Sequence, residues 1–292
     1  MRVTATILAN LCDYVVRKQF SGGLEMAVFS GSIYSDALKM DTTLHAVLTG
    51  DLRTERGCKP MLPGLKGKTL ILLHGLSRNG AAWLYYVPLF RFAEQYGLRV
   101  ILPDGHRSFY QDMTYGERYF TYIFEELPQL AHDLFGADIS PENLMIAGLS
   151  MGGYGALRCA FTAPTHYAYA GAFSAPTQLR SFVEDDDEAH RHFFAQERTA
   201  WFGTGYPIPE QSDLFALAER CGGTFSPLFL ACGRQDSLYP AGKSLYGHLE
   251  ELGATPVWFE QDGGHDWLFW ETALRHFLDF CAESEKNKTL VQ

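Results

Sequence analysis

From residue 69 onward, the chain alternates short apolar runs with longer stretches of helical hydrophobic periodicity. The runs TLILLHG (69–75), NLMIAGLS (143–150) and PLFLACG (227–233) are typical of strands buried on both faces. The stretches between such runs, for example 81–97, 116–136 and 265–284, favour helices, the first of which is expected to end on Gly97 as a C-cap. Strands that alternate with helices predict an α/β fold, with a mostly parallel central sheet and helices on both of its faces.

Two segments depart from this alternation. Residues 26–35 and 42–50 are rich in alternating and β-branched residues, which predicts an antiparallel pair of strands at the start of the domain. Residues from about 175 to 225 form an irregular segment that is too long for a simple connection, and we interpret it as a cap-like insertion. We therefore expect a single domain over residues 26–283 and a flexible C-terminal tail at 284–292.

Residues 1–25 are interpreted as an N-terminal extension. They resemble a signal peptide only weakly, because Asn10 and Asp13 interrupt the apolar stretch. Ser21, Gly22 and Gly23 can be encoded by a purine-rich stretch that would place a ribosome-binding site just upstream of a methionine. The hypothesis is that Met26 is the native start and that residues 1–25 are a translated leader.

Composition narrows the classes of partner. The net charge of −10 argues against nucleic acids and anionic membranes, which require basic patches. The sequence contains no run of 18 apolar residues, so we expect no membrane-spanning segment. The cysteines show no metal-like spacing, and as free thiols they favour a reducing, cytoplasmic location without a metal site. They are Cys12, Cys58, Cys159, Cys221, Cys232 and Cys281.

The stretch GLSMGGYGA (148–156) contains a G-x-S-x-G motif between a predicted strand and a predicted helix. This is the context of a nucleophile elbow, in which a tight turn exposes a serine hydroxyl. Side chains two residues before and after Ser150 would collide in such a turn, so Gly148 and Gly152 are required there. A plain glycine-rich turn remains the alternative until partners for the serine are found.

A serine nucleophile needs a base that is oriented by a carboxylate, and in this fold the chain order is serine, acid, histidine. We expect His265 to be the base, because it lies in a Gly-rich loop just before the last helix. Asp236 follows a predicted strand and is the expected acid, with Asp213 in reserve. The other histidines after the serine are expected on the surface or within helices: His166, His190, His192, His248 and His276.

An oxyanion hole needs two backbone N–H groups. We expect them from Met151, which follows the nucleophile, and from Leu76, in the loop after the strand at 69–75. His74 at the end of this strand is interpreted as a packed residue that hydrogen-bonds the loop.

Several separated motifs together resemble one family. LLHGLSRNGAAWL, LPDGHRSFYQDMTYGERYFTYIFEELP, AGLSMGGYGAL, CGRQDSLY and GGHDWLFW resemble the esterase D / putative esterase family of α/β-hydrolases, and in particular its tributyrin esterase branch. The resemblance covers roughly residues 26–282. It implies the α/β-hydrolase fold, the same triad and oxyanion donors, no cofactor, and it allows a homo-oligomer. The N-terminal extension and His106 depart from the family pattern.

These features predict a serine carboxylesterase that acts on small-molecule esters, and the resemblance implies short acyl groups, from acetyl to butyryl. Tyr115, His106 and Trp267 are the expected pocket residues. The alternatives are a thioesterase of the S-formylglutathione hydrolase type, an acyltransferase, and a non-catalytic binding module on the same fold. The sequence leaves the alcohol part of the substrate open.

Overall fold

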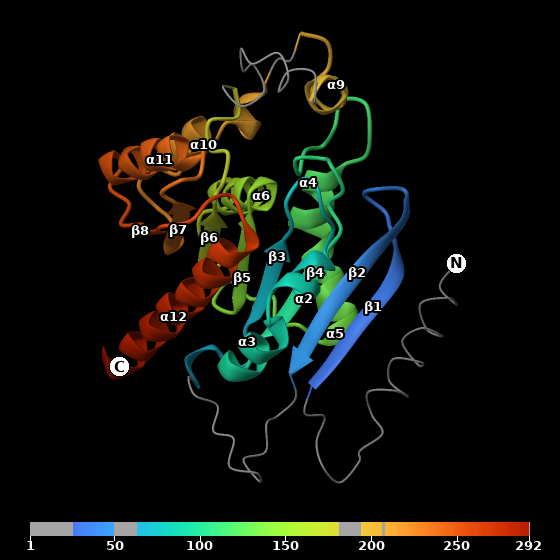
Figure 1. Ribbon diagram of the computed structural model, residues 1–292. Helices are drawn as coiled ribbons and strands as arrows, with labels where there is room; N and C mark the ends of the chain where they lie inside the picture. The colour runs from blue at the N-terminus through green and yellow to red at the C-terminus, as the bar shows by residue number, and fades with distance from the viewer. Residues whose placement is uncertain (1–25, 50–62, 181–193, 206–207, 292) are drawn as a thin grey trace.

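The fold is built on one central sheet of eight strands (Figure 1). The computed structural model describes residues 26–49, 63–180, 194–205 and 208–291. The sheet order is β1-β2-β4-β3-β5-β6-β7-β8, and all neighbouring pairs from β4 to β8 are parallel. The strands are β1 (Met26–Ser35), β2 (Met40–Thr49), β3 (Thr69–Leu73), β4 (Arg99–Pro103), β5 (Leu144–Leu149), β6 (Tyr169–Phe173), β7 (Leu228–Gly233) and β8 (Val257–Gln261).

The opening antiparallel pair is confirmed. β1 and β2 are paired along their whole length, and β2 also runs antiparallel to β4. The turn between β1 and β2 is held by Glu126, whose carboxylate accepts hydrogen bonds from the Ser35 hydroxyl at 2.6 Å and from the backbone N–H of Ala37 at 3.1 Å. This anchor ties the first hairpin to the helical layer of the domain.

Helices connect the parallel strands and cover both faces of the sheet (Figure 1). The α-helices are α2 (Ala82–Tyr86), α3 (Leu89–Tyr96), α4 (Tyr119–Thr121), α5 (Leu127–Phe135), α6 (Met151–Thr162), α9 (Ala195–Phe202), α10 (Leu214–Arg220), α11 (Tyr239–Glu251) and α12 (Trp267–Val291). Shorter turns are η2 (Pro63–Leu65), η4 (Glu210–Ser212) and the π-helical segment η3 (Tyr122–Glu126).

Prolines interrupt two of the expected helices. The helix expected to end at Gly97 is divided into α2 and α3, because Val87 precedes Pro88 and adopts an extended conformation with φ −127° and ψ 140°. The helix expected at 116–136 widens into η3 just before Pro128, which has no N–H to donate to the preceding turn. The expected stop at Gly97 is confirmed, since this residue caps α3 in the left-handed conformation, and Gly136 caps α5 in the same way.

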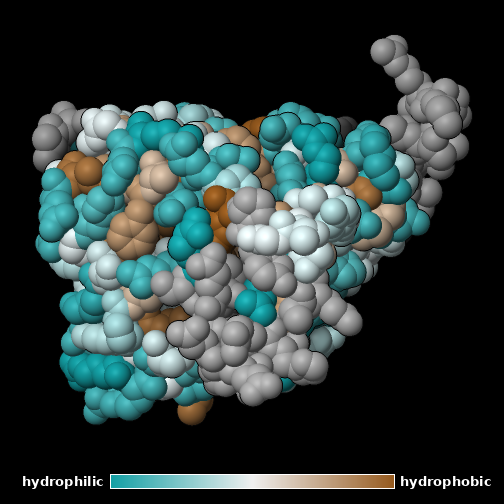
Figure 2. Space-filling view, turned by 90° about the horizontal axis from the view of Figure 1, so that it is seen from above, coloured by the Kyte–Doolittle hydropathy of each residue, from teal (hydrophilic) through white to brown (hydrophobic). Residues whose placement is uncertain are grey.

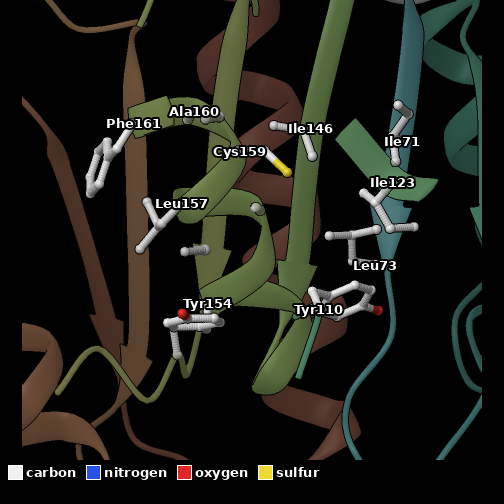
Figure 3. Close-up of a cluster of buried hydrophobic side chains, with 14 of the residues drawn as sticks. Ile71, Leu73, Tyr110, Ile123, Ile146, Tyr154, Leu157, Cys159, Ala160 and Phe161 are labelled. Carbon is white, nitrogen blue, oxygen red and sulfur yellow. The ribbon is translucent and has the colours of Figure 1, made fainter. Parts of the chain in front are cut away.

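Two hydrophobic cores lie on opposite faces of the sheet. Alternate residues of each strand serve different cores: Ile71 and Leu73 face the core under α5, α6 and α10, whereas Leu70 and Leu72 face the core under α3 and α12. Figure 3 shows the first of these cores, in which Cys159 of α6 lies beside Ile146 of β5. Burial on both faces explains why the parallel strands are continuous apolar runs in the sequence.

The irregular segment from about 175 to 225 contains α9, η4 and α10 in its described part. Figure 1 shows α9 and α10 at the end of the molecule at which α6 begins. Seen from that end, the coloured surface is mostly hydrophilic, with hydrophobic residues scattered among hydrophilic ones (Figure 2). The expected N-terminal extension, residues 1–25, lies outside the described residues.

The expectation of a flexible tail at 284–292 is wrong for most of its length, because α12 continues to Val291. Glu285 attaches the extended helix to the domain. Its carboxylate accepts a hydrogen bond from the Tyr169 hydroxyl at 2.8 Å and lies 3.3 Å from the Lys68 ammonium group. None of the helices formed by the described residues is long and apolar enough to cross a membrane.

Candidate active site

Ser150 occupies a strained turn between β5 and α6. Its φ is 52° and its ψ is −122°, a conformation that non-glycine residues rarely adopt. A Cβ atom on Gly148 would collide with the Gly152 carbonyl, and one on Gly152 would collide with the Leu73 carbonyl. Gly152 therefore allows the first turn of α6 to pack directly against the end of β3, so both glycines of the motif are sterically required.

The structure brings Ser150, His265 and Asp236 together from three separate connections. The Oγ atom of Ser150 lies 3.0 Å from Nε2 of His265, and Nδ1 of His265 lies 2.8 Å from Oδ2 of Asp236. The side chain of His265 is 38 % exposed, whereas that of Asp236 is fully buried. This gradient leaves the serine hydroxyl and the imidazole accessible to a substrate while the carboxylate is shielded from water.

The loop after β7 holds Asp236 in its ionised form. Burial by itself raises the pKa of the carboxyl group, but hydrogen bonds from His265, the Leu238 N–H and the Ser174 hydroxyl, with the charge of His265, lower the pKa below its ordinary value. The loop is also fixed to the one that carries His265, because the Gln235 N–H donates to the Gly263 carbonyl at 3.1 Å. Acid and base are thus held together by backbone contacts as well as by their own hydrogen bond.

The alternative acids have structural roles elsewhere. Asp213 caps α10 by accepting a hydrogen bond from the Phe215 N–H at 2.9 Å. Asp266 caps the start of α12 by accepting from the N–H groups of Leu268 and Phe269, both at 3.0 Å. These contacts explain why nearby carboxylates in the sequence do not replace Asp236.

The alternative histidines are also placed away from the serine. His276 stacks on Phe259 at a ring distance of 4.2 Å, and His248 lies beside Phe215 at 5.0 Å. His166 packs against Tyr167, and burial lowers the pKa of its imidazole. His190 and His192 lie outside the described residues.

The loop after β3 lies next to the serine. A Cβ atom on Gly75 would be 3.4 Å from the Cβ atom of Ser150. His74 is fully buried; its Nδ1 donates to the Gly75 carbonyl at 2.7 Å and its Nε2 accepts from the Gly105 N–H at 2.8 Å. His74 thus packs and hydrogen-bonds the loop, as the sequence predicts. Met151 is the first residue of α6, where backbone N–H groups lack partners within the helix.

The expected pocket residues are separated from one another. Trp267 stacks on Tyr86 at 4.7 Å and meets Trp270 edge-on at 5.3 Å, and Trp270 in turn meets the His265 ring at 4.9 Å. Tyr115 is 63 % exposed and lies beside α9, where its N–H donates to the Ala200 carbonyl. His106 lies against the ring of Tyr119 at 5.8 Å. A pocket role for these residues stays a prediction.

Two residues near the site escaped the sequence analysis. Ser174 follows β6, is fully buried, and has a φ of 49°. Its hydroxyl helps to lower the pKa of the Asp236 carboxyl group and accepts a hydrogen bond from the indole N–H of Trp270 at 3.1 Å. Ser174 belongs to no recognisable motif. The available signal was its position directly after β6, the strand between β5 and β7.

Comparisons of sequence with known proteins agree on one family. Residues 59–217 match the family described as putative esterase. The chain is similar to an acetyl esterase of Caldicellulosiruptor saccharolyticus, with 29% identity over 88% of this chain and 99% of the relative. It is also similar to the S-formylglutathione hydrolase of Bos taurus, with 32% identity over 66% of this chain and 70% of the relative.

Solved structures with a similar fold include two proteins of Staphylococcus aureus. One is the fluorophosphonate-binding serine hydrolase F, with a TM-score of 0.77 and 25% identity over 89% of this chain and 99% of that protein. The other is an S-formylglutathione hydrolase, with a TM-score of 0.73 and 25% identity over 89% of this chain and 100% of that protein.

Proposed function

This chain belongs to the putative esterase family and is a serine esterase of the α/β-hydrolase fold, and from this premise we propose that Ser150, His265 and Asp236 are its catalytic triad. The observation that carries the proposal is the continuous hydrogen-bonded series at the elbow: serine to histidine at 3.0 Å and histidine to aspartate at 2.8 Å. The proposed reaction is the hydrolysis of short-chain acyl esters.

In the first half of the reaction, the Ser150 oxygen attacks the carbonyl carbon of the ester while its proton moves to Nε2 of His265. The negative charge that develops on the carbonyl oxygen is stabilised by the backbone N–H groups of Leu76 and Met151. The imidazolium then donates its proton to the leaving alcohol, and the acyl group remains on the serine. Asp236 stabilises the imidazolium through the hydrogen bond to Nδ1.

In the second half, water replaces the alcohol. His265 takes a proton from the water as it attacks the acyl-serine carbonyl, and the same N–H groups stabilise the second oxyanion. Collapse of this intermediate returns the proton to the Ser150 oxygen and releases a carboxylic acid. The exposed imidazole supports this step, because water reaches it without displacing the buried carboxylate.

Ser174 acts in this proposal as a positioning residue for the acid. Its hydroxyl accepts a hydrogen bond from Trp270 at 3.1 Å and helps to lower the pKa of Asp236, and Trp270 also lies edge-on against the His265 ring. Ser174 and Trp270 thus support both partners of the serine.

The proposed acyl preference, from acetyl to butyryl, is supported by the similarity to an acetyl esterase. A thioesterase of the S-formylglutathione hydrolase type is the second candidate, because proteins of that name are among both the sequence relatives and the structural neighbours. The connected serine, histidine and aspartate argue against a non-catalytic binding module. The free, buried thiols of Cys159, Cys232 and Cys281 support a cytoplasmic location.

One experiment tests the triad and the substrate together. A fluorophosphonate probe should label the wild-type protein and leave Ser150→Ala unlabelled. The wild-type protein should hydrolyse p-nitrophenyl acetate and butyrate faster than the octanoate. A kcat/KM for S-formylglutathione well above that for p-nitrophenyl acetate would replace the esterase assignment with the thioesterase. Labelling that persists in Ser150→Ala would refute the proposed nucleophile.

A further inference from the structure

A cavity of about 610 Å³ lies beneath the segment that contains α9, η4 and α10, on the side of α6 away from the start of the helix. Its volume lies within the range of small-molecule sites in proteins. The walls combine aromatic rings with cations. The rings are Phe120, Phe161, Trp201 and Phe202, and the cations are Arg118, Arg158 and Arg220.

The cavity is separate from the candidate active site. Ser150 and His265 do not line it, and Arg158 lies two turns of α6 beyond the serine, about 12 Å along the helix axis. A hydrogen-bonded wall stands between them: the Tyr154 hydroxyl donates to the Ser212 carbonyl at 2.6 Å and accepts from the Gln111 amide at 3.0 Å. A molecule in this cavity would therefore not occupy the place of the ester.

Arg158 is the unusual residue of the cavity. It is only 4 % exposed, yet no carboxylate among the described residues lies within ion-pair distance of its guanidinium group. Its hydrogen bonds go to neutral oxygens: Nε donates to the Gln211 carbonyl at 3.0 Å, and Nη1 donates to the Tyr110 carbonyl and the Gln111 amide oxygen, both at 2.7 Å. Nη2 has no hydrogen-bond partner among the described residues. Burial of a charge is costly unless an opposite charge compensates for it.

The acidic residues of the wall leave this charge uncompensated. The Asp112 carboxylate accepts from the N–H and the hydroxyl of Thr121, at 2.9 and 2.8 Å, and its nearest cation is Arg118 at 4.0 Å. Glu125 is exposed at the surface of the same wall. The guanidinium group of Arg158 lies over the Phe120 ring at 4.0 Å. The apolar part of a ligand whose anionic group binds Nη2 would therefore lie near this ring.

We propose that this cavity binds a small organic carboxylate with an apolar or aromatic body. The carboxylate accepts hydrogen bonds from Nη2 of Arg158, and the body lies among the aromatic side chains. Arg220 lies at the rim, where it is exposed and paired with Glu210 at 3.5 Å. A guanidinium group suits this ligand because it presents parallel N–H donors to a carboxylate. The site is independent of the proposed ester hydrolysis, because neither Ser150 nor His265 takes part in it.

Isothermal titration of the full chain with benzoate tests the proposal, with benzamide as the neutral probe of the same shape. We expect benzoate to bind at one site and benzamide to bind at least about tenfold more weakly, because the amide carries no charge for Arg158. The variant Arg158→Gln should weaken benzoate binding by about tenfold or more. Ser150→Ala should bind benzoate as the wild type does.

A matched control is Arg275→Gln. Arg275 also lies over a phenylalanine ring, at 5.3 Å from Phe92, but it does not line the cavity, so its removal should leave benzoate affinity unchanged. If Arg158→Gln fails to fold, as judged by circular dichroism, Arg220→Glu is tested in its place. This side chain is 48 % exposed, so its replacement should affect the fold little, and the variant should bind benzoate more weakly than the wild type. Absence of benzoate binding, or equal affinity in the wild type and in the folded cavity variants, overturns the proposal.

Discussion

Ser150 and Ser174 follow neighbouring strands of the same sheet, and their backbones are nearly alike. Their φ angles are 52° and 49°, and each N–H donates at 2.7 Å to a carbonyl of the next strand, that of Phe173 or of Ala231. Their side chains nevertheless have different surroundings. Ser150 is partly exposed and faces His265, whereas Ser174 is fully buried against Asp236 and Trp270.

The difference between the two serines shows that a strained backbone is not sufficient to make a nucleophile. Glycines flank Ser150 on both sides, which lets α6 begin at once beneath its hydroxyl and brings the loop after β3 alongside. Ser174 is followed at 175–178 by residues without regular structure, and its hydroxyl is buried. Similar φ angles therefore leave one hydroxyl partly exposed beside His265 and the other buried near Asp236.

The largest expected effect separates the two serines directly. Ser150→Ala should reduce kcat for p-nitrophenyl acetate by about 10⁴-fold or more, because the variant lacks the proposed nucleophile. Steady-state kinetics and a melting curve on the same preparation measure this, and the melting temperature should be nearly unchanged. Activity of the variant above about a hundredth of the wild type would place the nucleophile elsewhere.

Gly152→Ala tests the steric requirement that distinguishes the two turns. The new Cβ atom would collide with the Leu73 carbonyl, so α6 must move away from β3, and we expect the free energy of unfolding to fall by about 1–3 kcal/mol, with loss of activity. Urea unfolding measures the change. Gly247→Ala in α11 is the control, since no atom lies within 4 Å of its added Cβ and it should be neutral or stabilising. Equal stabilities of the two variants would contradict the elbow argument.

Ser174→Ala tests the contribution of the buried serine to activity. We expect kcat/KM to fall by about tenfold, consistent with the loss of one hydrogen bond to a charged group. Without the Ser174 hydroxyl the pKa of Asp236 should rise, so the carboxylate becomes protonated at a higher pH and the acid limb of the activity profile should move to higher pH.

The control for Ser174→Ala is Ser226→Ala, because Ser226 is also buried and donates its hydroxyl proton to the Pro164 carbonyl, away from the triad. Its pH profile should match that of the wild type. A Ser174→Ala profile that falls in height without any shift would indicate a purely structural role for this hydroxyl.

The smallest expected effect concerns stability at acid pH. The pKa of Asp236 is lower in the folded protein than its ordinary value of 3.8, so its contribution to stability is fully present above pH 3.8 and is lost as the pH falls through the lower, folded-state value. Urea unfolding between about pH 2 and 7 should therefore show a steeper loss of stability below pH 3.8 for the wild type than for Asp236→Asn. Parallel curves would mean that this carboxylate is not stabilised in the fold.

Much of the site was predictable because its signals are local in sequence. The glycines around Ser150 mark the turn, and His265 and Asp236 lie in loops after predicted strands. The structure brings these three residues together, and the family expected from the motifs is confirmed by the match over residues 59–217. The interruptions at Val87 and Tyr122 were missed, although Pro88 and Pro128 are the local cause of both.

Other features depend on contacts between distant residues and left no local signal. The helical end of the chain persists because Glu285 meets Tyr169 and Lys68, which are more than a hundred residues away. The support of Asp236 by Ser174 likewise requires two strands to be neighbours. A search for catalytic motifs does not find a serine whose only distinction is the strand beside it.

By itself, the sequence determined the parallel α/β architecture, the esterase family and the three residues proposed as the triad, because hydrophobic periodicity and glycine positions act through neighbouring residues. Tertiary structure alone decided which carboxylates became helix caps, that Ser174 lowers the pKa of Asp236, and that Arg158 lies buried beside a cavity with no carboxylate of the described residues paired to it. The physical reason is that burial and electrostatic pairing are properties of the packed molecule, and they arise only when segments distant along the chain come into contact.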